Sequence, residues 1–149
     1  MHMQELKSLV RIAGTTIDGT KRVPYGLAYI KGIGINLAFA ITRAAGIDES
    51  KKIGELTEEE IEKLEKMIQE IPGNLPSFML NKRKDLWTGE DKHLIGPDLV
   101  FDTRKHIDFM KKIKCWKGIR HALGLKVRGQ RTRTTGRKGR TVGVKRRKR

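Results

Sequence analysis

The last 33 residues of the chain, 117–149, contain no aspartate or glutamate, although they hold 14 lysines and arginines. The preceding 116 residues hold 19 basic and 17 acidic side chains, so the formal net charge of +16 divides into +14 and +2. A segment with charges of one sign repels itself unless an anion lies along it. Nucleic acid offers closely spaced fixed anions. The missing carboxylates therefore favour a nucleic-acid partner over the alternatives, a solvated disordered tail or a targeting signal.

Other absences exclude further classes of protein. No apolar run approaches the ~18 residues of a membrane span, and residues 1–4 do not begin a secretory signal, so we expect no membrane partner. The single cysteine, Cys115, cannot form an internal disulfide, which fits a reducing cytoplasm. Because the four histidines and this thiol show no metal-ligand spacing, we expect no metal and no other cofactor. His121 has neither a nucleophile nor a carboxylate beside it, which argues against an enzyme and a small-molecule substrate.

The apolar pattern predicts a mostly α-helical fold without a sizeable sheet. The clearest helix is 57–71, where Thr57 and Glu60 form a capping-box pair and isoleucines and leucines follow a helical stripe. Residues 6–13 resemble one extended strand, and 14–20 a turn. The other expected helices are 24–30, 36–45, a short one at 77–84, 97–114 with a buried stripe of Val100, Ile107, Met110 and Ile113, and 119–123 after a break at Lys117-Gly118.

Residues 27–41 carry apolar residues and glycines at helix–hairpin–helix spacing. Gly32 and Gly34 would allow a sharp turn with positive φ, and the second helix would begin with free N–H groups that can meet a phosphate. An ordinary helical hairpin, or one that contacts protein, is equally consistent with this pattern.

The sequence pattern divides the chain into three parts, at the Pro72-Gly73 helix end and at the start of the basic tail. We expect an N-terminal helical body with the helix–hairpin–helix-like unit at 1–72 and a second helical region at 73–125. Residues 126–149 form an extended basic tail, in which apolar residues almost vanish. Such a segment cannot bury enough surface to offset its conformational entropy, so it should order only on its partner.

Arginine dominates the basic residues after Trp116, with nine of the 14. Its planar guanidinium matches phosphate oxygens, while hydroxyl and amide groups add phosphate or ribose contacts. No aromatic residue follows Trp116, so we expect recognition of backbone and shape rather than of bases. The candidate RNA-binding residues are Lys117, Arg120, His121, Lys126, Arg128, Gln130, Arg131, Thr132, Arg133, Arg137, Lys138, Arg140, Lys145, Arg146, Arg147, Lys148 and Arg149.

The run Gly118–Thr132, GIRHALGLKVRGQRT, closely resembles the hallmark of the universal small-subunit ribosomal protein thirteen family. The hairpin at 31–34 and the opening VRIAG at 10–14 match the same family, and the resemblance covers nearly the whole chain. Residues 134–144, TTGRKGRTVGV, resemble its archaeal and eukaryotic branch, as does the longer middle region at about 73–98.

The resemblance implies a structural constituent of the small-subunit head that binds small-subunit rRNA in the cytoplasm. It implies that the body bridges to large-subunit protein five and that small-subunit protein nineteen is a neighbour. It also implies that the basic tail, residues 126–149, which we call the arm, reaches toward peptidyl-site tRNA. By the same resemblance, Lys126, Arg128, Arg131 and Arg133 face rRNA, and residues 145–149 face tRNA.

Two alternatives remain open from the sequence. Helix–hairpin–helix units also occur in DNA-binding and DNA-repair proteins, which would need a base-flipping pocket and a catalytic Asp or Lys beside the hairpin. Asp48 lies near in sequence, but the body is small for such a pocket. A protein that compacts DNA without sequence preference is the second alternative.

Overall fold

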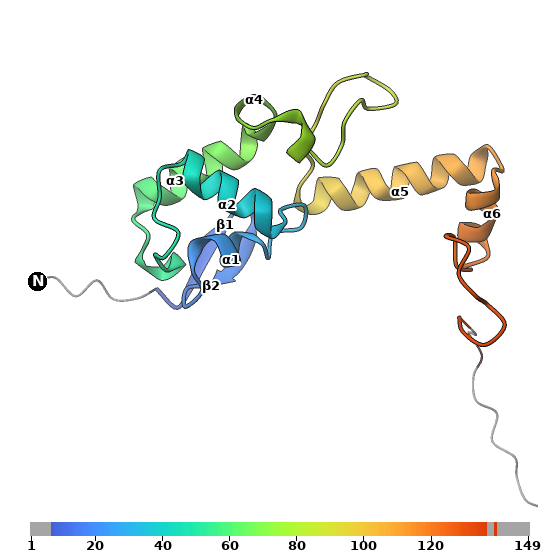
Figure 1. The fold of residues 1–149 in the computed structure, drawn as a ribbon, viewed down its shortest axis with the longest axis horizontal. Coiled ribbons are helices and arrows are strands. Elements are labelled where there is room, and N and C mark those ends of the chain that lie inside the picture. Colours follow the sequence, from blue (N-terminus) through green and yellow to red (C-terminus); the bar gives the residue numbers. More distant parts are fainter. Residues whose placement is uncertain (1–6, 137–138, 140–149) are drawn as a thin grey trace, which may run out of the picture. The chain divides into compact units, whose positions relative to one another are not determined.

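The computed structural model describes residues 7–136 and 139, and their contacts divide the chain after Phe101 into two units, which we refer to by their ranges 1–101 and 102–149. In chain order, the elements are β1 (Leu9–Ile12), β2 (Thr15–Asp18), α1 (Val23–Leu27), α2 (Ile35–Ala44), η1 (Ile53–Glu55), α3 (Glu58–Gln69), α4 (Ile71–Asn74), η2 (Ser77–Met79), α5 (Gly96–Lys112) and α6 (Trp116–Ala122), where η marks a short 3-10 helix (Figure 1). The fold is mostly α, as the sequence predicts.

The first unit begins with a two-stranded antiparallel hairpin, in which Ile12 pairs with Thr15 and Leu9 with Asp18. Ala13 and Gly14 both have positive φ, 46° and 74°, as a two-residue type I′ turn requires. The prediction that residues 14–20 form only a turn is therefore wrong. The cause is that Thr15, Thr16 and Ile17 satisfy their backbone groups by pairing with β1.

The helices of the first unit follow the sequence pattern closely. Pro24 lies in the first turn of α1, and α2 ends before Gly46, whose φ is +69°. Thr57 caps α3 by accepting the N–H of Glu60, and the Glu60 carboxylate accepts the N–H of Thr57. α3 ends at Gln69, and Pro72 and Gly73 lie within the next short helix, α4.

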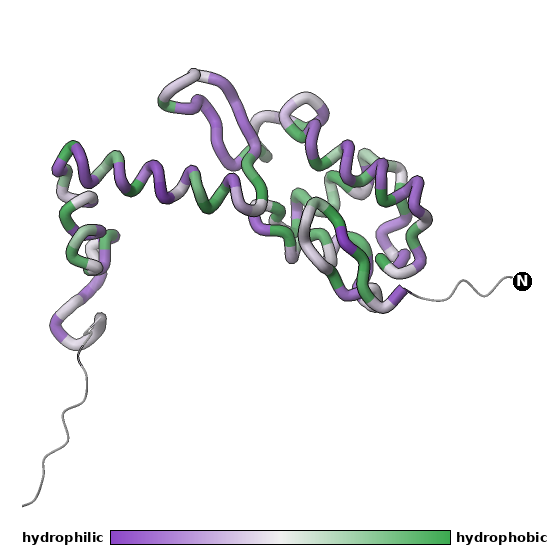
Figure 2. Tube along the Cα trace, turned by 180° about the vertical axis from the view of Figure 1, so that it is seen from behind, coloured by the Kyte–Doolittle hydropathy of each residue, from purple (hydrophilic) through white to green (hydrophobic). Residues whose placement is uncertain are grey.

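One hydrophobic core lies in the first unit, and it contains every buried valine, leucine and isoleucine of the described residues. It joins the hairpin, α1, α2, α3 and the segment up to Leu80. Ile12, Leu27, Ile41 and Leu64 are fully buried, so β1, α1, α2 and α3 meet in this core. The polar loop at 81–95 then leads to α5 and is mostly hydrophilic (Figure 2).

Three predictions about the later helices are wrong. Only Ser77–Met79 is helical in 77–84, because Lys82 pairs with Lys92 and begins a loop. The predicted stripe of α5 is not buried: α5 contains no buried residue, and Ile113 is 56% exposed. Gly118 does not break a helix but lies inside α6.

Candidate nucleic-acid interface

The corner between α5 and α6 is tight and depends on Cys115 and Gly118. Lys114 has a φ of 53°, and the Cys115 Sγ caps α6 by accepting the N–H of Gly118 at 3.4 Å. The same thiol donates to the Met110 carbonyl oxygen at 3.5 Å. A Cβ on Gly118 would lie 2.0 Å from that oxygen, so only glycine fits at this position. Cys115 and Gly118 thus have structural roles.

The end of α6 sets the direction in which the chain leaves the helix. Gly124 has a φ of +66°, its N–H donates to the His121 carbonyl at 3.2 Å, and the N–H of Leu125 donates to the Arg120 carbonyl at 2.9 Å. These two bonds form a Schellman motif, in which a glycine in the left-handed region reverses the chain. The motif explains the sequence LGL at 123–125.

Arg120 braces this exit with its side chain. Its Nε donates to the carbonyl oxygen of Lys126 at 2.9 Å, and its guanidinium carbon lies 5.7 Å from the centroid of the Trp116 ring. The ring and the carbonyl together fix the guanidinium. The side chain of Arg120 therefore joins the helix to the first residue of the arm.

The described part of the arm curves, and it contains no strand between residues 126 and 136. Gly129 and Gly136 have φ values of 70° and 74°. A Cβ on Gly136 would lie 3.5 Å from Cε of Lys126, so the chain returns toward its starting point, and the Thr135 hydroxyl donates to the Arg131 carbonyl at 2.6 Å. The exposed candidate residues here are Lys126, Arg128, Gln130, Arg131, Thr132 and Arg133.

The candidates are thus distributed over α6 and the arm. Lys117 is exposed on α6, and His121 is half-buried near its end. The remaining candidates lie outside the described residues: Arg137, Lys138, Arg140, Lys145, Arg146, Arg147, Lys148 and Arg149.

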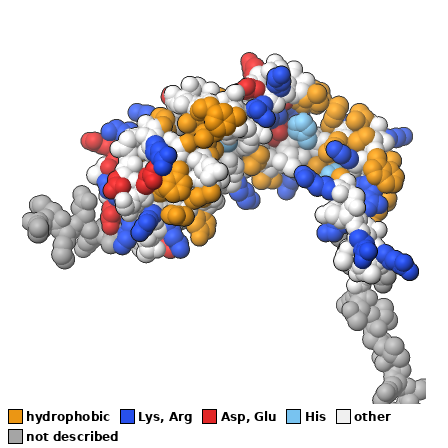
Figure 3. Space-filling model, in the orientation of Figure 1, with side chains coloured by type: hydrophobic (Ala, Val, Ile, Leu, Met, Phe, Trp, Pro, Cys, Tyr) orange, Lys and Arg blue, Asp and Glu red, His pale blue; other side chains and the backbone are white. Residues whose placement is uncertain are grey.

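The basic surface begins earlier than the sequence prediction placed it. The second unit, 102–149, holds 19 lysines and arginines against two acidic residues, whereas the first unit, 1–101, holds 14 against 15. Figure 3 shows lysines and arginines but no acidic side chain on the described part of the chain after α6. The basic segment predicted from the sequence begins at Lys117. It leaves out five basic residues between 102 and 116, because Asp102 and Asp108 interrupt the run of positive charge there.

The hairpin glycines belong to the first unit and differ from each other. Gly32 has a φ of +101°, but Gly34, which precedes α2, has a φ of −86°. A cavity of about 520 Å³ lies at the start of α2, and among the described residues that line it are Asn36, Asn81 and His93, but no lysine or arginine. The first turn of α2 therefore borders a mostly apolar hollow, lined also by Ile35, Leu37 and Phe78, without a lysine or arginine among the described residues that would help to hold a phosphate.

His93 holds the turn at Gly32. Its Nδ1 accepts the N–H of Asn81 at 3.3 Å, and its Nε2 lies 3.1 Å from the Gly32 carbonyl oxygen. Burial lowers the pKa of His93, while the bond to Gly32 opposes this effect. The neutral ring with its proton on Nε2 satisfies both contacts.

A cluster of metal-ligating side chains and a membrane-spanning helix are both absent from the described residues. Across residues 7–136 and 139, no three histidine, cysteine, aspartate or glutamate side chains are grouped so that they could hold a metal ion. No helix in the same part of the chain is both long and apolar enough to cross a bilayer.

Comparison with known proteins agrees with the resemblance in the sequence. Residues 11–138 match the family described as ribosomal protein S13/S18. The small ribosomal subunit protein uS13 of Staphylothermus marinus is 58% identical over 142 residues, which cover 95% of this chain and 94% of the relative. The proteins of the same name from Hyperthermus butylicus and Methanopyrus kandleri are 56% and 54% identical, and in both cases the match covers 95% of each chain. The chain therefore belongs to the ribosomal protein S13/S18 family and is a structural protein of the small ribosomal subunit rather than an enzyme.

Proposed function

We propose that the chain binds small-subunit rRNA through its second unit. The observation that carries this proposal is the division of charge between the two units: 19 basic residues against two acidic ones in the second, and near balance in the first. Phosphates that meet lysines and arginines release condensed counterions, and this release drives binding. The second unit buries no apolar side chain among its described residues. A hydrophobic core of its own therefore does not account for its structure, which leaves contact with RNA as its role.

Within this unit, the exposed residues of the arm make the phosphate contacts. Arg128 and Arg131 have exposed side chains, and the glycines between and after them let the backbone approach RNA. Lys117 and His121 contribute from α6, together with the candidates of residues 137–149. Arg120 serves binding differently, because its Nε already donates to Lys126 and thereby fixes the start of the arm.

In this proposal the helical core of the first unit, up to Leu80, faces proteins. Its charges balance, and Tyr25 and Tyr29 are 51% and 64% exposed, as residues of a protein contact often are. We assign it the bridge to large-subunit protein five and assign small-subunit protein nineteen as a neighbour, following the family resemblance. Residues 145–149 reach the peptidyl-site tRNA, and the protein works in cytoplasmic ribosomes. The hairpin at Gly32 and Gly34 is a helix–hairpin–helix-like scaffold of this unit.

A salt titration of the full chain with purified small-subunit rRNA tests the proposal. If about eight cations contact duplex-like RNA, the logarithm of the binding constant falls with the logarithm of salt concentration with a slope of about −7. Filter binding measures this slope. A slope near zero, or equal affinity for random duplex DNA, contradicts the proposal.

Deletion of residues 126–149 separates binding from folding. The deletion is expected to weaken rRNA binding while the helical circular-dichroism signal stays nearly intact, because every core residue lies before residue 81. A matched control replaces Lys63 and Lys66 of α3 with glutamine. It removes charge from the first unit and should leave affinity unchanged.

A further inference from the structure

The loop between η2 and α5, residues 81–93, is held in one conformation by its backbone; we call it the braced loop. Lys82 and Lys92 exchange N–H···O bonds of 3.2 and 2.8 Å. Closer to the tip, the N–H of Asp85 donates to the Glu90 carbonyl at 2.9 Å, and the N–H of Gly89 donates to the Asp85 carbonyl at 2.7 Å. Long surface loops without helix or strand are usually mobile unless they are tied down in this way.

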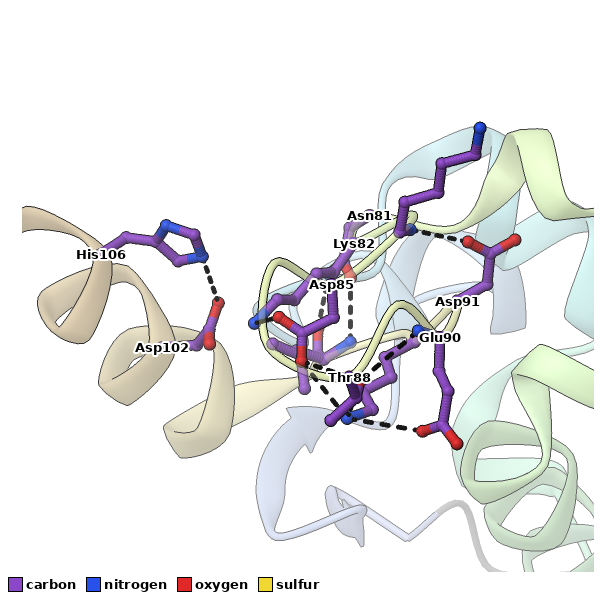
Figure 4. A network of polar contacts seen from close by, with 11 residues as sticks. Asn81, Lys82, Asp85, Thr88, Glu90, Asp91, Asp102 and His106 are labelled. Atoms are coloured by element: carbon purple, nitrogen blue, oxygen red, sulfur yellow. Dashed lines mark hydrogen bonds and ion pairs between the residues drawn. The ribbon is translucent and has the colours of Figure 1, made fainter. Parts of the chain in front are cut away.

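A buried carboxylate braces the same loop from inside. Asp85 is 7% exposed, with its Oδ1 3.0 Å from Nζ of Lys82 and its Oδ2 3.3 Å from Nζ of Lys92. The Thr88 hydroxyl donates to Oδ2 at 3.2 Å (Figure 4). The hydrogen bond from Lys82 lowers the pKa of Asp85 most, and bonds from Lys92 and Thr88 help to hold it at about 2. Asp85 is therefore ionised at neutral pH.

The other carboxylates of the loop are also engaged. Asp91 accepts the N–H of Lys84 at 2.7 Å and stabilises that residue at a φ of 48°. Glu90 lies 3.7 Å from Nζ of Lys92. Asp85 and Asp91 thus serve the structure of the loop itself, whereas the Glu90 side chain stays 71% exposed.

The loop presents a different set of side chains to its surroundings. Leu86 and Trp87 are 62% and 52% exposed, so its tip combines an aliphatic side chain with an aromatic one. Arg83 and Lys84 are exposed, and neither side chain forms an ion pair within residues 7–136. In Figure 2 a short hydrophobic stretch marks the tip of the otherwise hydrophilic loop. An aromatic ring beside two cations is typical of sites that bind unpaired nucleotides.

We propose that the braced loop is a second RNA contact, in which Trp87 stacks on an unpaired base and Arg83 and Lys84 bind the neighbouring phosphates. This inference rests on the proposed function, because it takes RNA as the partner of the chain. Charge favours RNA over a protein partner here, since Arg83 and Lys84 form no ion pair among the described residues while Asp85 and Asp91 are held by contacts within the loop. The braces also reduce the conformational entropy lost on binding. The loop supplies the aromatic stacking group that the arm lacks.

Fluorescence of Trp87 tests the stacking directly in the full chain. The protein has two tryptophans, so Trp116→Phe leaves Trp87 as the only one. Titration of this variant with purified small-subunit rRNA should quench the emission of Trp87. Replacement of Trp87 by alanine in the otherwise unchanged chain should weaken binding about tenfold, the usual order for loss of one stacked base.

The cations are tested by the salt slope. Arg83→Gln with Lys84→Gln should reduce the magnitude of the slope by about 1.4, since a contact with a single strand contributes about 0.7. The control pair, Lys63→Gln with Lys66→Gln, makes the same charge change elsewhere in the first unit and should leave the slope unchanged.

The outcomes separate this inference from the proposed function. If wild type and the Trp116→Phe variant both fail to bind rRNA in filter assays, the proposed function and this inference fail together. If both bind but the emission of Trp87 does not change, only the braced-loop inference is overturned. Shielding of Trp87 by a purified ribosomal protein, with no response to rRNA, also overturns it and assigns the loop to a protein partner.

Discussion

Gly32 and Gly34 lie two residues apart in the hairpin but have different conformational requirements. Gly32 has a φ of +101°, and a Cβ there would lie 2.5 Å from the Leu94 carbonyl oxygen. Gly34 has a φ of −86°, and a Cβ there would meet nothing within 4 Å. We predict that Gly32→Ala lowers the free energy of unfolding by about 2 kcal/mol or more, through backbone strain and overpacking.

Gly34→Ala is the matched control, and we expect it to cost less than about 1 kcal/mol, because it changes only a helix N-cap. Urea unfolding followed by circular dichroism measures both values. Similar losses in the two variants would show that the contact with Leu94 does not determine the requirement for glycine.

His93 gives the first unit a pH dependence of known sign. Its pKa lies below the ordinary value of 6.5 because burial disfavours the charged ring, so the unfolded chain takes up this proton first as the pH falls. The stabilisation is complete above about pH 6.5 and is lost as the pH falls through the lower pKa of the folded state. We predict a lower thermal midpoint at pH 5 than at pH 7.5.

His93→Gln should remove most of this difference, because glutamine does not titrate in that range and can still donate to the Gly32 carbonyl. Thermal unfolding at the two pH values provides the comparison. An equal drop in midpoint in the variant would assign the pH dependence to another group.

The role of a single residue could be predicted from the sequence where its partners are close neighbours along the chain. The capping box of Thr57 and Glu60 needs only its own turn of helix, and the structure confirms it. The roles of Gly118 and Arg120 were missed because they depend on the Met110 and Lys126 carbonyls, whose positions follow from how the chain bends. The distinction between Gly32 and Gly34 depends likewise on Leu94, 62 residues away from Gly32 along the chain.

At the scale of elements, the helices with a buried face were predictable and the others were not. Leu64 and Ile68 mark the inner face of α3, and its limits agree with the sequence pattern within about two residues. The same pattern in α5 predicted a buried stripe that the structure does not contain, because apolar spacing cannot tell whether a covering element exists. β2 was missed because a four-residue strand shows little alternation.

The exit from α6 yields a prediction about the arm. Arg120 is engaged with Lys126 and Trp116, whereas Arg128 is exposed. We predict that Arg120→Gln weakens rRNA binding but leaves the salt slope nearly unchanged, because it misdirects the arm without removing a phosphate contact. Arg128→Gln should reduce the magnitude of the slope by about 0.9, the contribution of one phosphate in a duplex.

Filter binding at several salt concentrations distinguishes the two arginine variants. Each removes one positive charge, so a change in net charge alone would affect them equally. If Arg120→Gln reduces the slope as much as Arg128→Gln does, Arg120 contacts phosphate directly.

At the scale of the whole molecule, the structural division and the charge division coincide near residue 101. The first unit contains the entire described core, from Val10 to Leu80, and its charges nearly balance. We therefore predict that a fragment of residues 1–101 unfolds cooperatively, with a thermal midpoint close to that of the full chain. It should bind small-subunit rRNA far more weakly than the full chain.

Calorimetry of the fragment and of the full chain makes this comparison. A fragment without a cooperative transition would show that residues after 101 contribute to folding. The sequence alone predicts parts that end at residue 72, where Pro72-Gly73 ends the predicted helix, and at residue 125, after which apolar residues almost vanish. The division at residue 101 rests on a different criterion, because it follows from contacts in the structure that the sequence does not report.

The lack of buried apolar side chains in the described part of the second unit has a consequence for how the cell adjusts the amount of this protein to the amount of rRNA. Copies made in excess of new subunits would expose Trp116, Ile119 and Leu123 to proteases. We expect proteases to cleave such surplus chains first at α6. The rate of rRNA synthesis would then set how much of the protein survives. Pulse-chase labelling after a block in rRNA transcription would reveal this, and unchanged turnover would contradict it.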